Sequence, residues 1–180
     1  LPMIANPTIP KSALLAHSAR LLTRALLWAP PAIRRFERAR IQRRSVGGDG
    51  SRRRILFYYS QVPWQEVWQR PQEVALGLAD CLPVVYLSPL QVQRIYDSVP
   101  DWQRELTIDR GHGVRVVQPL ILPGEYKSPQ IAALNRRLIR AEACAALDPE
   151  ADLVFFSNSP FSAPLLDRFD WSQRIYDAID

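Results

Sequence analysis

The sequence has few of the residues that bind metal ions. It contains two cysteines, Cys81 and Cys144, and two histidines, His17 and His112. The cysteines are far apart, form no CxxC pair, and each falls in a segment with a helical pattern. This scarcity argues against a zinc site, so we expect no metal and two buried thiols in a reducing compartment.

Long hydrophobic runs and phosphate-binding glycine loops are also missing. The longest uncharged apolar run, residues 25–33, includes two prolines and is too short to cross the ~30 Å hydrocarbon core of a bilayer. The glycines at positions 47, 48 and 50 precede the first predicted strand instead of following it. They therefore indicate a flexible linker and not a phosphate loop.

Acidic residues are scarce in the first part of the chain. Residues 1–54 contain twelve Lys and Arg against only Glu37 and Asp49, a net charge of +10, whereas the rest of the chain carries −5. Leucines are interleaved with the arginines, and Pro30 and Pro31 are expected to break the helix. This pattern is typical of an amphipathic segment on a membrane surface, and we assign residues 11–44 to contact with an anionic membrane.

Other roles for this basic segment stay open at this stage. It could bind RNA, remain a disordered tag, or pack against another domain. The segment has few aromatics among its basic residues for base stacking, which disfavours nucleic acid. We expect a basic leader with a linker over residues 1–50 and a folded domain over 51–180.

Beyond the linker, apolar runs alternate with helical patterns. An α/β fold is expected, a Rossmann-like doubly wound parallel sheet whose strand-end loops gather at one edge. The predicted strands are 55–59, 84–87, 114–117, 152–156 and 175–179, and the predicted helices are 71–79, 130–147 and 163–169. Residues 119–129 are expected to form a loop.

The strand-end loops and the last strand carry the candidate site residues. Aromatic faces, amides and carboxylates together suit a sugar, because indole rings cover its apolar face while polar groups bond its hydroxyls. An arginine can hold a phosphate with two hydrogen bonds. The candidates are Trp64, Trp68, Gln69, Arg70, Asn158, Ser159, Asp177 and Asp180.

Each candidate also has a purely structural interpretation. Trp64 or Trp68 could cap the core, since tryptophan is usually largely buried. Arg70 could pair with Glu73 on the following helix. Asn158 could form a turn or cap a helix without binding a ligand.

Several motifs resemble one known family. The residues concerned are Trp68-Gln69-Arg70-Pro71-Gln72, Tyr86-Leu87-Ser88-Pro89, Asn135-Arg136, Phe156-Ser157-Asn158-Ser159-Pro160-Phe161 and Tyr176-Asp177-Ala178-Ile179-Asp180. Residues 54–180 resemble the amino-terminal domain of GT-B glycosyltransferases, in particular bacterial enzymes of teichuronic-acid and exopolysaccharide biosynthesis. The W-x-R-P element and the terminal Y-D-x-x-D carry most of this resemblance.

The resemblance implies a retaining transferase that moves a sugar from a nucleotide sugar to a glycan or lipid-linked acceptor. The amino-terminal domain would bind the acceptor through Trp64, Trp68, Gln69, Arg70, Asn158 and Ser159, and Asp177 or Asp180 would orient a hydroxyl or the transferred sugar. A carboxyl-terminal domain would hold the nucleotide sugar, so we expect the protein to continue past Asp180 and this chain to be inactive alone. No cofactor is implied. We expect a cytoplasmic protein peripheral to the inner face of the cytoplasmic membrane.

Two other functions fit the same edge of the sheet. One is a nucleotide-sugar epimerase, against which the W-x-R-P loop argues. The other is a non-catalytic carbohydrate-binding or scaffold module that docks on a membrane.

Overall fold

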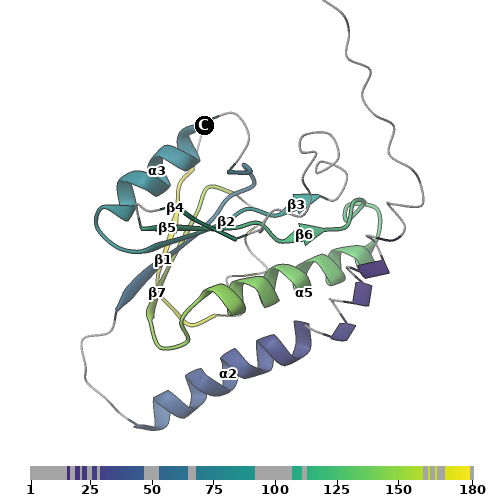
Figure 1. Ribbon diagram of the computed structural model, residues 1–180, viewed down its shortest axis with the longest axis horizontal. Helices are drawn as coiled ribbons and strands as arrows, with labels where there is room; N and C mark the ends of the chain where they lie inside the picture. Colours follow the sequence, from purple (N-terminus) through teal and green to yellow (C-terminus); the bar gives the residue numbers. More distant parts are fainter. Residues whose placement is uncertain are drawn as a thin grey trace, which may run out of the picture.

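A computed structural model describes the chain at residues 16, 19–20, 22–23, 26–27, 29–46, 53–64, 68–91, 107–110, 113–159, 162, 165 and 169–178. The helices are α2 (Ala29–Val46), α3 (Arg70–Ala79) and α5 (Pro129–Ala146). The strands are β1 (Arg54–Tyr59), β2 (Val84–Leu87), β3 (Leu90–Gln91), β4 (Thr107–Arg110), β5 (Val114–Val117), β6 (Leu120–Ile121), β7 (Asp152–Ser157) and β8 (Trp171–Tyr176). Figure 1 shows their arrangement.

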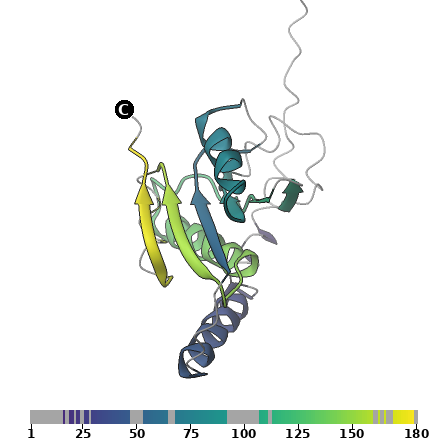
Figure 2. The same cartoon turned by 90° about the vertical axis from the view of Figure 1, so that its left-hand side faces the viewer.

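A mostly parallel sheet forms the centre of the molecule. Its strand order is β4-β5-β2-β1-β7-β8, and the five strands from β5 to β8 run parallel. Figure 2 shows β8, β7 and β1 side by side with their carboxyl ends at the same edge. The predicted α/β fold with a Rossmann-like parallel sheet is therefore confirmed.

Two short features near the sheet differ from the sequence prediction. Strand β4 pairs antiparallel with β5, and Gly113 adopts a positive φ of 79° in the turn that precedes β5. The expected loop at 119–129 begins with β6, which pairs with β3 in a separate two-stranded sheet. Both features are too short for alternation of apolar residues to reveal them. The helix predicted at 163–169 lies mostly outside the described residues. The strand predicted at 175–179 is β8 at Trp171–Tyr176, so it begins four residues earlier than expected and ends before Asp177.

Helices cover both faces of the sheet. Side chains of α3 pack on one face with Tyr58, Tyr86 and Trp64. On the other face, α2 and α5 pack against a cluster that includes Phe57 and Phe155. A parallel sheet needs cover on both faces, because its strands are apolar on both sides.

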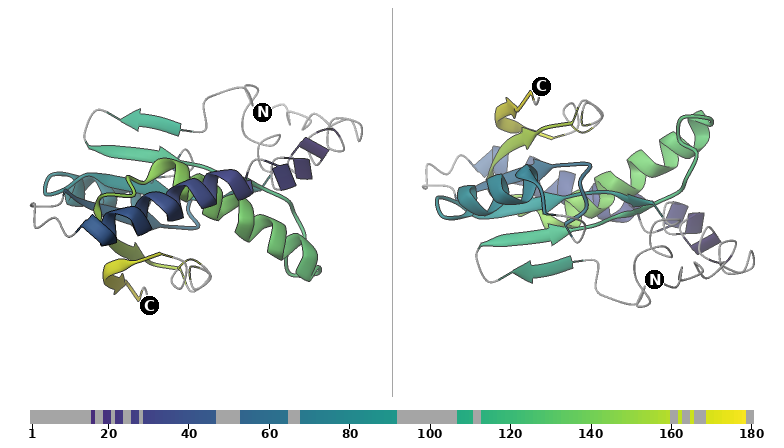
Figure 3. Two further views of the ribbon diagram at one scale, coloured as in Figure 1. Left: turned by 90° about the horizontal axis from the view of Figure 1, so that it is seen from below. Right: turned by 90° about the horizontal axis from the view of Figure 1, so that it is seen from above.

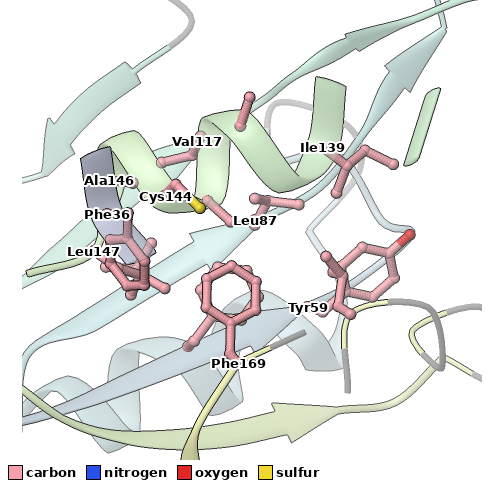
Figure 4. Close-up of a cluster of buried hydrophobic side chains, with 14 of the residues drawn as sticks. Phe36, Tyr59, Leu87, Val117, Ile139, Cys144, Ala146, Leu147 and Phe169 are labelled. Carbon is pink, nitrogen blue, oxygen red and sulfur yellow. The ribbon is translucent and has the colours of Figure 1, made fainter. Parts of the chain in front are cut away.

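Helix α2 differs most from its expected role. Pro30 and Pro31 lie in its first turn, where a missing N–H costs nothing, so they begin a new helix that was not predicted from the sequence. Ile33 and Phe36 are buried, and the helix lies against α5 (Figure 3). Figure 4 shows Phe36 in the same buried cluster as Phe169. The centroids of the two rings are 5.6 Å apart. This described part of the expected leader therefore shares a core with the sheet.

The two thiols lie in different environments. Cys144 on α5 is buried, and burial raises the pKa of its thiol to about 12. Cys81 is exposed, so the expectation that both thiols are buried is wrong for it. The reason is that α3 ends at Ala79 and leaves Cys81 in the turn that follows.

The packing of α2 on the sheet gives a stability prediction. Phe36→Ala should lower the free energy of unfolding by about 3 kcal/mol, because it removes a buried ring and leaves a cavity. Urea unfolding followed by circular dichroism would measure this loss. The matched control is Arg38→Ala on the exposed face of α2, which should change stability by less than about 0.5 kcal/mol. Equal stability of Phe36→Ala and the parent protein would show that α2 does not pack there.

Candidate functional site

The strand order points to one position on the sheet edge. The chain runs outward from β1 to β2 and β5, then returns to place β7 on the other side of β1. In open parallel sheets, ligands bind at the carboxyl ends of the strands where the order reverses in this way. That position lies between the ends of β1 and β7, next to the loop that leads from β1 into α3.

The two tryptophans of this loop have different surroundings. Trp64 is only 6% exposed and packs edge-on against Tyr86, with ring centroids 4.9 Å apart. Trp68 is 49% exposed and meets Trp64 edge-on at 5.7 Å. Trp64 is therefore a core residue that supports Trp68, and Trp68 is the tryptophan of the pair that is open to a ligand.

A buried glutamine fixes the start of α3. The Gln72 amide nitrogen donates to the carbonyl oxygen of Pro63 at 3.2 Å, and its amide oxygen accepts from the backbone N–H of Gln69 at 3.1 Å. Gln72 itself is completely buried, whereas Gln69 is exposed at the N-cap position of the helix. The sequence prediction missed Gln72, which holds the loop and the helix start together.

The two motifs that carried the family resemblance meet at this edge. Arg70 Nη2 donates to Asp177 Oδ1 at 3.1 Å, and the two residues are 107 positions apart in the sequence. The Arg70 side chain is 59% exposed and that of Asp177 is 20% exposed. The partner of Arg70 is thus Asp177 and not Glu73, the alternative considered from the sequence.

Two buried tyrosines, Tyr58 and Tyr86, belong to the core cluster that α3 covers. The Tyr86 hydroxyl donates to the Val62 carbonyl oxygen at 2.8 Å, and the Tyr58 and Tyr86 rings meet edge-on at 5.2 Å. Burial raises the pKa of both phenols. For Tyr58 the nearby Tyr86 and Asp177 raise the pKa further, while Arg70 lowers it. Both phenols are therefore protonated at neutral pH, and Tyr58 is close enough to the Arg70–Asp177 pair to sense its charges.

Hydrogen bonds among three serines shape the loop after β7. Ser157 Oγ lies 3.1 Å from the Tyr59 carbonyl oxygen and accepts from the Ser159 backbone N–H at 3.0 Å. The Ser162 hydroxyl donates to the Ser159 carbonyl oxygen at 2.8 Å. Ser159 is buried within this hydrogen-bond network, whereas Asn158 is half-buried at the carboxyl edge of the sheet. Asp180, the other predicted carboxylate, lies outside the described residues.

The site that results has an exposed indole, an ion pair and an amide. These are Trp68, the Arg70–Asp177 pair and Asn158. Within the described ranges, no group of three or more His, Cys, Asp or Glu side chains is placed to hold a metal ion. The groups present can stack on a ring and exchange hydrogen bonds with a polar, uncharged or anionic ligand.

Comparison of the chain with protein-family models, with curated proteins and with solved structures finds no match. The function must therefore be argued from the site.

The Tyr86 hydroxyl gives a pH-dependent prediction. At pH 7, Tyr86→Phe should be less stable by about 1 kcal/mol, because the hydrogen bond to Val62 is lost. Above the ordinary tyrosine pKa near 10, the unfolded phenol releases its proton while the folded phenol keeps it, so parent stability falls with rising pH. The gap between the two proteins should then shrink, by up to about 1.4 kcal/mol per pH unit.

Urea unfolding of both proteins between pH 7 and pH 11 measures this gap. The interval from pH 7 to pH 9 is the internal control, since neither state of Tyr86 changes protonation there. A gap that stays constant up to pH 11 would contradict a raised pKa for Tyr86.

Proposed function

We propose that this chain is the acceptor-binding, amino-terminal half of a GT-B glycosyltransferase. The reaction would transfer a sugar from a nucleotide sugar to a glycan or lipid-linked acceptor, with retention at the anomeric carbon. The meeting of the W-x-R-P loop and the Y-D-x-x-D segment through Arg70 and Asp177 carries this proposal. Two motifs that resemble one family and are distant in sequence meet where parallel sheets bind ligands.

The aromatic and charged groups have separate roles in this proposal. The exposed face of Trp68 stacks on the acceptor sugar, and Trp64, which itself packs on Tyr86, supports the Trp68 indole. Arg70 donates hydrogen bonds to acceptor oxygens, and the half-buried Asn158 bonds a hydroxyl. Gln69 and Ser159 shape the loops that carry these groups.

Asp177 acts on Arg70 in this proposal. An exposed ion pair contributes only about 0–1 kcal/mol to stability, so the pair is better suited to orientation than to holding the fold. One Asp177 oxygen accepts from Arg70, which fixes the direction of the guanidinium. We therefore propose Asp177 as a positioning residue, and Asp180 stays the candidate for contact with the transferred sugar.

The chemistry then depends on positioning. The acceptor hydroxyl must lie next to the anomeric carbon of a donor that a carboxyl-terminal domain would supply. Alignment of this kind can lower the activation barrier by several kcal/mol. No metal or cofactor takes part in this proposal. The 180-residue chain would bind acceptor without transferring sugar.

The epimerase alternative receives no support from the loop after β1. Dinucleotide-binding sheets place a glycine-rich turn between the first strand and the first helix, and residues 60–69 contain no glycine. A carbohydrate-binding scaffold would use the same edge, and it differs from the transferase in the lack of turnover by the full-length protein.

We also propose that the basic segment contacts an anionic membrane. Leu22, Leu26 and Leu27 are exposed, as are Arg34 and Arg35 on the first half of α2. Among the helices that the structure describes, none has the length and apolar content needed to cross a bilayer. The contact would therefore be peripheral, on the inner face of the cytoplasmic membrane.

Replacement of the exposed tryptophan tests the acceptor site. Trp68→Ala should weaken glycan binding at least about tenfold, or ~1.4 kcal/mol, because the stacking surface is lost. Isothermal titration calorimetry with glycans identified on an array measures the affinity. The control is Tyr126→Ala, which removes an exposed aromatic from the loop before α5. Equal affinity of Trp68→Ala and the parent for every glycan that binds would remove Trp68 from the site.

The membrane contact is tested by removal of charge. Triple replacement of Arg34, Arg35 and Arg38 by Gln should weaken binding to phosphatidylglycerol vesicles by about a hundredfold, since each basic residue near anionic lipid contributes about 1 kcal/mol. The control replaces Arg136, Arg137 and Arg174 by Gln and gives the same net charge. Cosedimentation at two salt concentrations measures binding. Equal losses in both triple variants would mean that net charge alone drives the contact.

A further inference from the structure

Polar residues line the carboxyl edge of the sheet in a single row. Backbone hydrogen bonds extend the ladders one residue past the strands, from Ser60 to Leu87 at 3.0 Å, from Ser88 to Val117 at 3.1 Å and from Asp177 to Ser157 at 2.9 Å. The row that this register sets side by side, one residue from each parallel strand, is Gln118, Ser88, Ser60, Asn158 and Asp177.

The alternation of side chains along the strands, continued by one residue, places this polar row on the α3 side of the sheet. The residues two positions earlier on each strand, which point to the same face, belong to or pack against the core cluster under α3. They are Val116, Tyr86, Tyr58, Phe156 and Ile175. The Trp64–Trp68 pair lies on the same side, because Trp64 packs on Tyr86.

Ser88 and Gln118 are the unusual members of the row. Both are buried, and among the residues that the structure describes the Ser88 hydroxyl and the Gln118 amide nitrogen have no hydrogen-bond partner. By contrast, Ser60 Oγ accepts from the Val62 N–H at 3.1 Å. Buried polar groups without a partner are rare in folded proteins, and two of them at paired positions require an explanation.

The sequence explains the break in the backbone ladder at this point. Pro119 directly follows Gln118 and has no N–H to donate to the Ser88 carbonyl oxygen, so the ladder between the two chain segments is interrupted there. The ladder resumes between Leu90 and Leu120, in the pair β3 and β6. Ser88 and Gln118 thus lie side by side at a break in an otherwise continuous parallel pair.

We propose that Ser88 and Gln118 form a second subsite that binds a hydroxyl group of the acceptor glycan. The inference rests on the proposed function. One hydroxyl oxygen can accept from the Gln118 amide and exchange a hydrogen bond with Ser88, which satisfies both groups. Neither side chain is charged, so a buried phosphate would be costly there and a neutral hydroxyl fits.

The position of the subsite sets the size of the acceptor. Ser88 and Asp177 are separated by three inter-strand spacings, or about 14 Å at ~4.8 Å per strand. A single sugar ring does not reach from the Arg70–Asp177 pair to Ser88 and Gln118. The acceptor is therefore an oligosaccharide chain, which contacts Trp68 and Arg70 at one end and the second subsite at the other.

The test compares two buried glutamines. Gln118→Leu should weaken binding of trisaccharides about tenfold while binding of monosaccharides stays unchanged and the melting temperature does not fall, because the amide nitrogen removed is buried without a hydrogen-bond partner. Gln72→Leu is the matched control, since both ends of that amide are hydrogen-bonded, and it should lower the melting temperature by about 4 °C. Calorimetry with a panel of mono-, di- and trisaccharides and thermal unfolding measure both effects.

Nuclear magnetic resonance of the Gln118 side-chain amide gives an independent readout. Its resonances should shift when a trisaccharide binds and stay in place when a monosaccharide binds. Unchanged trisaccharide affinity of Gln118→Leu, together with an amide that does not shift, would overturn the subsite and leave a bound water as the partner. Lack of binding of every glycan to the parent protein would instead overturn the proposed function itself.

Discussion

The placement of β1 between β2 and β7 is the constraint on which the rest of the structure depends. Every side chain of β1 from Ile55 to Tyr59 is buried, so this strand must be paired on both edges and covered on both faces. Helix α3 covers one face, and α5 with α2 covers the other. The return of the chain to β7 then brings two loops that are about a hundred residues apart to one point on the sheet edge.

Much of this arrangement could be predicted from the sequence, for identifiable reasons. The runs that became β1, β2, β5 and β7 are rich in β-branched and aromatic residues, and α5 has a clear helical period. The pairing of β4 with β5 depends on tertiary contacts that no local pattern encodes, and the exposure of Cys81 depends on where α3 ends. Helix α2 was not predicted, because prolines that end one helix can also lie in the first turn of the next.

The candidate site was predictable as a set of residues and not as a set of contacts. The rule that strand-end loops gather at one edge brought Arg70, Asn158 and Asp177 together in advance. It did not distinguish Trp64 from Trp68, because burial of an indole depends on which neighbours it meets, here Tyr86 for Trp64. The choice of Asp177 over Glu73 as the partner of Arg70 likewise depends on the approach of β8, which the sequence does not encode locally.

The apolar core stabilises the fold by packing, whereas the polar edge of the sheet holds the loops by hydrogen bonds. Tyr86 keeps its ring in the core and donates its hydroxyl to the Val62 carbonyl oxygen in the loop after β1, so this residue connects the two regions. Most polar groups of the edge bond one another and hold the loops in place, as Gln72 and the serines after β7 do. A polar group that is buried there without a hydrogen-bond partner lowers the stability of the fold by about 1–3 kcal/mol, because no hydrogen bond offsets the cost of its desolvation. Ser88 and Gln118 carry such groups, and a ligand that supplies the missing hydrogen bonds would offset this cost, which packing within the protein does not.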